Sequence, residues 1–484
     1  SNSLMMNSTM SSSRKSMMSK APLAITALAS LLILSGCGPE ATEAPPEVVE
    51  EVSQPAPELE VVEEVRIPPE WTQSESPSPV DVCKVPDQRS GAAGNSQAKQ
   101  AVGFPVSKST LPIEGEVNLI AAMVAFDDAP APDLTAEDFF APQLEKITEW
   151  SDFWSQGALR YEFQMVEEWV TVPVNHADYP INSRENYQQS RENSARIIQL
   201  VIDNLPEDLD YAGADGYLVY WSPGIDEFHS DVAVRGDEGV TLRTPDGPRQ
   251  MFFWSGNNFH YRDTGRMTAE IKRDYTWSLW IYFLLLSQGL KLHAPRKGWP
   301  TALRQSQITT PDFSPAIPVW DAFRMGWVDD SQVHCVTPEN LEEGPQRILL
   351  TPQEVYGGER KTIIIPVDSR NDVLVIESRR PIGATRWSED ESGLLVYTVN
   401  PSVGTVELMS QESQRSCGNT DDYSKWAYYL YPDHVDMGSL DCNDFTRAFV
   451  REGDTLSHRD LRISLDFSAE ELDYVTIEAV ASAG

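Results

Sequence analysis

Positive charge is scarce in this chain. It has 38 lysines and arginines against 74 aspartates and glutamates, which gives a net charge of −36 over 484 residues. Nucleic acid is itself a polyanion and would be repelled, so nucleic-acid binding is excluded from the expected functions. An excess of carboxylates is instead typical of a solvated extracellular surface.

The apolar run near the N-terminus is too short to cross a membrane. Ala21 to Leu34 has 14 residues, whereas a spanning helix needs about 20. The run follows a basic segment and ends in Leu34-Ser-Gly-Cys37, which resembles the lipobox of bacterial lipoproteins. The resemblance implies that residues 1–36 are a signal peptide and that Cys37 carries a lipid, which would anchor the protein to a membrane of the bacterial cell envelope on its extracytoplasmic side. The alternative is a cysteine that follows an ordinary signal peptide by chance.

Cysteines are few, with five in the whole chain. Once Cys37 is set aside, an exported chain with four well-separated cysteines is expected to form two disulfide bonds, and three pairings remain open. None of them has the C-x-x-C spacing of a metal or redox site. Structural bridges are therefore the expected role of the remaining four, Cys83, Cys335, Cys417 and Cys442.

Composition divides the rest of the chain into three parts. Residues 37–79 are rich in proline, glutamate and valine and poor in aromatics, so we expect an extended, disordered tether. Residues 80–345 combine long apolar runs with helical periodicity. Residues 346–484 contain short apolar segments separated by turn residues, which predicts a β-rich module packed on the core.

Hydrophobic patterns in residues 80–345 predict both strands and helices. Continuous apolar runs at 118–126 and 217–221 are typical of buried strands. Apolar residues recur at helical spacing over 135–154 and 191–205. The run 276–290 is apolar on all sides, so if it is helical it is a central buried helix. This mixture predicts an α+β fold.

Several short segments follow one another in a recognisable order. They are Val124-Ala-Phe-Asp-Asp-Ala-Pro130, Ser155-Gln-Gly-Ala-Leu-Arg-Tyr-Glu-Phe163, Asp215-Gly-Tyr-Leu-Val-Tyr-Trp-Ser-Pro-Gly224, Trp320-Asp-Ala-Phe-Arg-Met-Gly-Trp-Val328, Leu374-Val-Ile-Glu-Ser-Arg-Arg380 and Gly393-Leu-Leu-Val-Tyr-Thr-Val399. Together they resemble the M6 family of secreted metallopeptidases, the immune inhibitor A type, over roughly residues 115 to 400. The resemblance implies a zincin-like peptidase core in residues 80–345, followed by the β-rich module.

The zinc motif of that family has no counterpart in this chain. A zincin helix carries His-Glu-x-x-His, in which two histidines bind zinc and the glutamate acts as general base. When the motif is aligned on Gly289-Leu290, these positions hold Tyr282, Phe283 and Leu286, and the third ligand falls on Leu292. Apolar side chains can neither bind zinc nor deprotonate a metal-bound water. The resemblance therefore implies a peptidase helix without its metal, and we expect no cofactor.

No other histidine pair replaces the missing motif. None of the seven histidines is followed by glutamate, and no two lie within five positions of each other. His229 lies in the acidic stretch 226–231, which is typical of a solvated loop. His293, one residue after Leu292, is expected to be a loop histidine, with a surviving ligand role as the alternative, and nothing in the sequence supports His260 as a ligand. Asp127-Asp128 offers oxygen donors in a turn, so a calcium ion could bind there. The sequence also has no Gly-x-Ser-x-Gly elbow and no P-loop.

We expect a lipid-anchored, M6 metallopeptidase-like protein that is catalytically inactive and acts as a binding or scaffold protein. Its cleft would take a peptide or protein ligand. Four tryptophans are candidates for lining it, with core packing as their alternative role: Trp221, Trp254, Trp277 and Trp280. Two other functions remain open. One is an active zinc endopeptidase with an atypical ligand set, and the other is a structural or adhesive surface lipoprotein.

Overall fold

The structure, a computed structural model, describes part of the chain. The described residues are 71–86, 102–106, 111–180, 187–222, 233–234, 241–249, 252–256, 276–290, 316–367, 372–382, 389–401, 427–437 and 445–480. The chain divides into two units, Ser1–Glu64 and Val65–Gly484, and every described residue belongs to the second. The predicted signal peptide and the lipidation candidate Cys37 therefore lie outside the described residues. No helix in the described ranges is long and apolar enough to cross a membrane.

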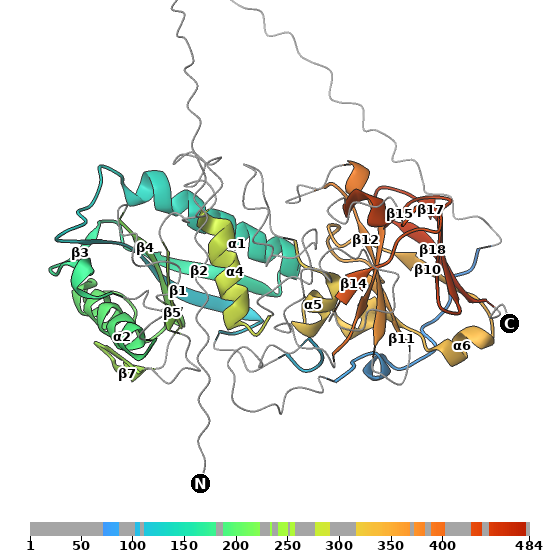
Figure 1. The fold of residues 1–484 in the computed structure, drawn as a ribbon, viewed down its shortest axis with the longest axis horizontal. Helices are drawn as coiled ribbons and strands as arrows, with labels where there is room; N and C mark the ends of the chain where they lie inside the picture. The colour runs from blue at the N-terminus through green and yellow to red at the C-terminus, as the bar shows by residue number, and fades with distance from the viewer. Residues whose placement is uncertain are drawn as a thin grey trace, which may run out of the picture. The chain divides into compact units, whose positions relative to one another are not determined.

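The first half of the described chain forms a mainly parallel, six-stranded sheet (Figure 1). The strand order is β2-β1-β4-β8-β5, with β3 also paired to β1, and every pair is parallel except β5 with β8. The strands are β1 (Gly115–Phe126), β2 (Leu159–Met165), β3 (Val170–Val172), β4 (Gly216–Trp221), β5 (Ala233–Val234) and β8 (Phe252–Gly256). The strands predicted at 118–126 and 217–221 are confirmed as β1 and β4.

Strand β1 is buried on both faces of this sheet. Val117 and Met123 belong to one hydrophobic cluster, whereas Ile120 and Val124 point the other way and belong to a second. Successive side chains of a strand point to opposite faces, so a strand with helices on both sides needs apolar residues at every position. This explains why the run in the sequence is continuous rather than alternating.

Two helices cover the two faces. Helix α1 (Ala141–Ser155) packs in the cluster that contains Val117, and α2 (Tyr187–Asn204) packs in the other. Helix α1 is preceded by a π-helical turn, η3 (Ala136–Phe140), and it ends where Gln156 adopts a positive φ of 54°. The helix predicted over 135–154 therefore begins as this wider turn. Regular α-helical bonding starts where Pro142, which lacks an N–H, fits the first turn.

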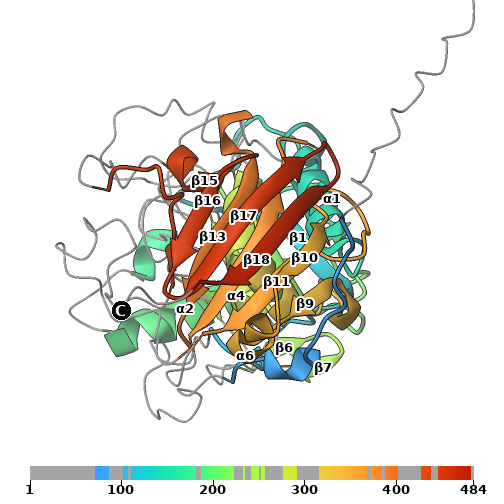
Figure 2. The same ribbon diagram turned by 90° about the vertical axis from the view of Figure 1, so that its right-hand side faces the viewer.

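The C-terminal part contains two sheets packed face to face. One has the order β14-β13-β12-β11-β9 with β15 also paired to β13, and the other has the order β10-β18-β17-β16. Figure 2 shows the four-stranded sheet in front of β11 and β13. The strands are β9 (Val333–Cys335), β10 (Gln346–Leu350), β11 (Thr362–Pro366), β12 (Val373–Arg379), β13 (Gly393–Val399), β14 (Ala427–Tyr429), β15 (Phe449–Val450), β16 (Thr455–His458), β17 (Leu461–Ser468) and β18 (Asp473–Ala479).

Shorter elements connect and cover these sheets. They are the helices α4 (Thr276–Ser287), α5 (Val319–Arg324) and α6 (Pro338–Glu342), the hairpin strands β6 (Leu242–Thr244) and β7 (Gly247–Arg249), and the 3-10 turns η1 (Val80–Val82), η4 (His176–Asp178), η7 (Asp330–Gln332), η8 (Glu389–Glu391) and η9 (Phe445–Ala448). The described residues thus combine helices with mixed sheets, as the α+β prediction requires.

The six-stranded C-terminal sheet links the two halves of the described chain. Its strands β12 and β13 are buried along their whole lengths. Ile376 and Val396 pack toward the four-stranded sheet. Val375 and Tyr397 belong instead to the cluster that contains α1, α4 and Trp320 of α5. One hydrophobic core therefore extends from the first sheet into the second half.

Residues 71–86, which we call the N-terminal strap, run along the C-terminal sheets. The backbone N–H of Ser74 donates to the carbonyl of Arg347 in β10 at 2.7 Å, and that of Ser78 donates to the carbonyl of Cys335 in β9 at 3.3 Å. A disulfide bond joins Cys83 to Cys335. The strap thus covers the outer edges of β10 and β9, where unpaired backbone groups would otherwise be open to another chain.

Two predicted domain limits differ from the structure. Residues 71–79, at the end of the predicted tether 37–79, lie in the strap because their hydroxyl and backbone groups bond to β9 and β10. Strand β9 precedes the predicted boundary between 345 and 346, yet it pairs with β11 in the C-terminal sheet. Composition identifies polar, proline-rich segments, but it does not show which of their backbone groups will find partners.

The disulfide is one of the three pairings that the sequence left open. Its formation between Cys83 and Cys335 leaves Cys417 and Cys442 for the second predicted bridge, and both lie outside the described residues.

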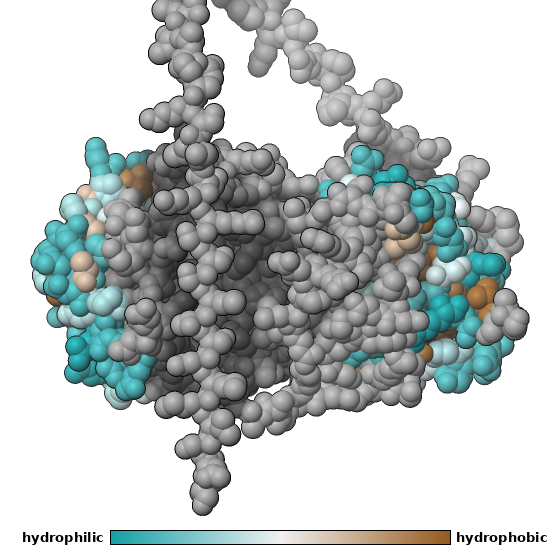
Figure 3. Space-filling view, viewed as in Figure 1, coloured by the Kyte–Doolittle hydropathy of each residue, from teal (hydrophilic) through white to brown (hydrophobic). Residues whose placement is uncertain are grey.

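On the face shown in Figure 3, the described surface is mostly hydrophilic, as expected for a solvated, acidic protein.

Candidate functional site

Helix α4 is the element on which the functional prediction depends. It packs on α1 and β8, and the side chains of Trp280, Ile281, Leu284 and Leu285 are fully buried. The ring of Trp280 lies 5.3 Å from that of Phe140. The predicted buried helix in the run 276–290 is confirmed as α4.

Buried polar contacts fix both ends of α4. At its start, the backbone N–H of Trp277 donates to the side-chain oxygen of Gln143 at 3.1 Å. Just beyond its end, Gln288 is fully buried, accepts a hydrogen bond from the Tyr161 hydroxyl at 2.8 Å and donates to the carbonyl of Pro112 at 2.6 Å. Burial, opposed by the hydrogen bond with Gln288, raises the pKa of Tyr161, so this phenol stays neutral.

The three positions of the degenerate motif lie in this helix. Tyr282, Phe283 and Leu286 belong to α4, but their side chains lie outside the described residues. The same holds for Leu292 and for the candidate ligands His229, His260 and His293.

The candidate tryptophans do not all lie on one side of the first sheet. Trp280 and the half-buried Trp277 belong with the cluster around α1 and α4. Trp221 is fully buried in the opposite cluster, with its ring 5.6 Å from that of Phe126. It therefore packs in the core beneath α2 and does not line a cleft next to α4. The side chain of Trp254 lies outside the described residues.

The acidic turn after β1 has a structural role in the described residues. One carboxylate oxygen of Asp128 accepts from the backbone N–H and from the ring Nδ1 of His176, each at 2.8 Å. The other accepts from the N–H of Ala177 at 3.2 Å. Burial acts to raise the pKa of Asp128, but these bonds to His176 and Ala177 hold it below its usual value. The carboxylate thus caps the start of the turn η4. The calcium prediction at Asp127-Asp128 stays open.

Within the described ranges, no group of three or more histidine, cysteine, aspartate or glutamate side chains could hold a metal ion. The sequence did not single out the pairing of Asp128 with His176. The only signal was an acid at the end of a strand, and this is too common to specify a partner 48 residues away.

A buried network of charged groups joins α5 to the C-terminal sheet, and sequence reasoning missed it. Glu377 accepts from the N–H of Val319 at the start of α5 at 2.6 Å and from the hydroxyl of Tyr397 at 3.0 Å. The guanidinium of Arg379 bonds to Glu377 at 2.6 Å and donates to the carbonyl of Ile317 at 2.5 Å. The backbone N–H of Trp320 also donates to the Tyr397 hydroxyl at 3.3 Å, so residues of the segments 320–328, 374–380 and 393–399 meet in this network.

Burial sets the protonation behaviour of this network. Complete burial raises the pKa of Glu377, and the nearby Arg379 only partly offsets it. Burial alone would lower the pKa of Arg379, but the carboxylates of Glu377 and Glu354 raise it. Both side chains of the pair are closed to solvent. The network can hold α5 against the sheet, but a substrate in solution cannot reach it.

No protein-family model matches the chain, and no curated protein matches it. The described residues define an α+β protein in which a buried apolar helix and a parallel sheet share one core.

Proposed function

We propose that the protein is a lipid-anchored, extracytoplasmic relative of the M6 metallopeptidases that has lost hydrolysis and acts by binding a peptide or protein. The observation that carries this proposal is α4. It is a buried helix on a parallel sheet, and Tyr282, Phe283 and Leu286 occupy the positions where the family has its zinc motif.

The convergence of the resemblance segments supports the proposal. Residues 374–379 and 393–399 lie in the neighbouring strands β12 and β13, and Trp320, 77 residues before Tyr397, joins them through the hydrogen bond from its backbone N–H to the Tyr397 hydroxyl. The family resemblance is therefore consistent with the packing of the chain.

The chemistry of α4 supports loss of hydrolysis. A zincin needs imidazole donors for the metal and a carboxylate to deprotonate the bound water. Each fully buried apolar side chain on such a helix contributes about 1.5–3 kcal/mol to stability. Trp280, Ile281, Leu284 and Leu285 act in this way. The helix thus has the contacts that place it on the sheet, while its sequence lacks the motif for metal chemistry.

The full chain, purified after growth with added zinc, is expected to retain far less than one zinc per chain and to leave unfolded casein intact. Elemental analysis and gel electrophoresis check these two outcomes. The lipid anchor is tested with the variant Cys37→Ser, which is expected to move the protein from the membrane fraction to the soluble fraction.

The proposal would be contradicted if the protein bound one zinc per chain and cleaved casein, and if a chelator removed the zinc and stopped the cleavage. This result would favour the active-peptidase alternative. The variants His229→Ala, His260→Ala and His293→Ala would then identify the atypical ligands by loss of bound zinc. If zinc and cleavage are both absent and cross-linking in the intact envelope recovers no specific partner, the structural or adhesive alternative is favoured.

A further inference from the structure

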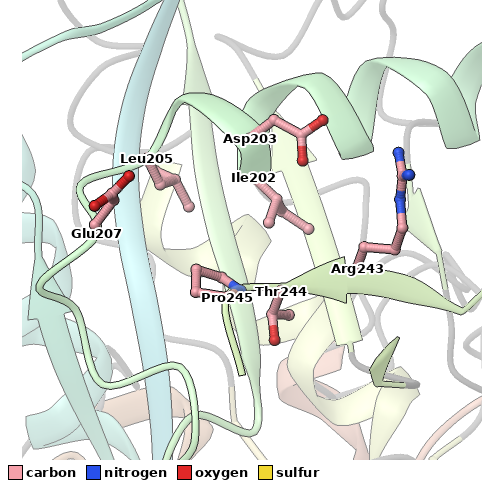
Figure 4. A pocket seen from close by; sticks show the side chains of 7 residues that line it. All are labelled: Ile202, Asp203, Leu205, Glu207, Arg243, Thr244 and Pro245. Carbon is pink, nitrogen blue, oxygen red and sulfur yellow. The ribbon is translucent and has the colours of Figure 1, made fainter. Parts of the chain in front are cut away.

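A surface pocket lies on the α2 side of the first sheet, between the end of α2 and the β6–β7 hairpin. Its volume is about 670 Å³, within the range of about 300–1,000 Å³ that small-molecule sites occupy. Seven residues line it: Ile202, Asp203, Leu205, Glu207, Arg243, Thr244 and Pro245 (Figure 4). The cluster beneath it contains Trp221 and not α4, so the pocket is separate from the site discussed above.

Direct hydrogen bonds hold the two walls together. The side-chain amide of Gln199 in α2 donates to the carbonyl of Arg243 and accepts from its N–H, each at 2.9 Å. In the hairpin, the hydroxyl of Thr244 donates to the carbonyl of Gly247 at 2.8 Å. These bonds link helix and hairpin without any ligand, so the pocket is pre-formed and binding would need little ordering.

The pocket has an apolar floor and a charged rim. Ile202 and Leu205 are 2% and 6% exposed. Figure 4 shows Glu207 at one end of the pocket and Arg243 at the opposite end, with Ile202 and Pro245 between them. Both charged side chains are solvent-exposed, and neither forms an ion pair within the described residues. Asp203, which accepts from Gln199 at 2.7 Å, adds a second carboxylate on the helix side.

We propose that this pocket binds a short peptide with free termini, such as an apolar dipeptide. The ammonium group would pair with Glu207, the carboxylate would pair with the guanidinium of Arg243, and the side chains would cover the apolar floor. Opposite charges at the two ends of a pocket favour a ligand that has opposite charges at its own two ends. An extended chain advances about 3.3–3.6 Å per residue, so a dipeptide or tripeptide suits a pocket of this size.

Saturation-transfer NMR titration of the full chain with Leu-Leu tests the proposal. The measurement is made at about pH 6.5, where the peptide's α-amino group remains protonated. N-acetyl-Leu-Leu lacks the ammonium and Leu-Leu-amide lacks the carboxylate. Each blocked peptide is expected to bind about tenfold more weakly than Leu-Leu, because a charge-assisted hydrogen bond is lost at one end. Equal binding of all three peptides, or no binding of Leu-Leu up to its solubility limit, overturns the proposal.

Two variants assign the ends of the ligand. Arg243→Gln is expected to abolish the preference for Leu-Leu over Leu-Leu-amide, and Glu207→Gln to reduce the preference for Leu-Leu over N-acetyl-Leu-Leu. Both side chains are exposed at the rim, so folding should be retained, and circular dichroism checks this. Arg347→Gln, an exposed arginine on β10 far from the pocket in sequence, is the matched control and should leave both preferences unchanged. If both rim variants keep the full preferences, or if the control loses them, the assignment is wrong.

Discussion

His334 in β9 is a titratable side chain that is completely buried. Burial, reinforced by the positive charge of Arg360 and opposed by Gln346, lowers the pKa of His334 to about 4. Neither of its ring nitrogens has a hydrogen-bond partner of normal geometry in the described residues. The folded protein therefore keeps this imidazole neutral at pH values where a solvated histidine is charged.

Acid should therefore destabilise the protein through His334. The unfolded chain takes up this proton near pH 6.5, whereas the folded chain resists it down to about pH 4. The stability contribution is fully present above about pH 6.5 and is lost as the pH falls to about 4, with a total loss of about 3 kcal/mol. Urea unfolding of the wild type and of His334→Leu over this range checks the prediction.

The test compares how steeply the free energy of unfolding changes with pH in the wild type and in His334→Leu, and not the absolute stabilities of the two proteins. Carboxylates and the other histidines titrate in both proteins, so their effects cancel in the difference. The wild type should lose stability faster than His334→Leu as the pH falls. Parallel curves would show that His334 does not control this acid response.

At the scale of elements, the end of α4 depends on one side-chain amide. Gln288 connects the helix to Tyr161 of β2 and to the carbonyl of Pro112. Both side chains are completely buried, so neither can exchange a lost partner for water. An unsatisfied buried polar group costs about 1–3 kcal/mol.

Gln288→Leu is expected to lower the free energy of unfolding by about 1–3 kcal/mol, because it leaves the buried Tyr161 hydroxyl without its hydrogen-bond partner. Tyr161→Phe should cost less, since Gln288 keeps its other bond. The double variant should cost less than the sum of the two, by about 0.5–1.5 kcal/mol of coupling. Denaturant unfolding of the wild type, the two single variants and the double variant measures this coupling. Strictly additive losses would contradict the hydrogen bond between Tyr161 and Gln288.

Local patterns predicted single elements better than they predicted pairings. The apolar runs that became β1, β4 and α4 are strong signals because each is buried on several sides. The pairing of β10 with β18 has no local signal, since Ile348 and Val475 meet only in the folded chain. For the same reason the sequence showed that α4 lacks a zinc motif but not that Gln288 would bond to Tyr161, 127 residues away.

The strap shows the limit of composition as a guide. Its prolines and serines resemble those of the predicted tether, so composition alone places residues 71–79 in the tether. Their folded conformation comes from specific bonds, such as those of the Ser76 hydroxyl with the backbone of Cys335. Only the arrangement of β9 and β10 decides whether a serine bonds to a strand or to water.

At the scale of the whole molecule, the disulfide between Cys83 and Cys335 closes a loop with a sequence separation of 252 residues. Both cysteines are completely buried. A cross-link over so long a loop restricts the unfolded chain strongly, and its removal typically costs about 2–5 kcal/mol. The thiolate of an external reductant has no direct access to a buried bond.

Cys83→Ser with Cys335→Ser is therefore expected to lower the free energy of unfolding by about 2–5 kcal/mol. Denaturant unfolding under oxidising conditions measures the loss. The wild type in mild reductant should keep its bond until it unfolds, which mass-spectrometric thiol counting can follow. Rapid reduction of this bond in the native protein, or a double variant as stable as the wild type, would contradict the prediction.

The strap also determines where the fold would bear tension. A pull applied to the chain ahead of Trp71 meets the ring contact of Trp71 with Tyr474 and then the bonds to β10 and β9. The covalent link at Cys83 then carries the load into β9 before it can reach β1. The force would therefore enter the C-terminal sheets before it reaches the parallel sheet and α4.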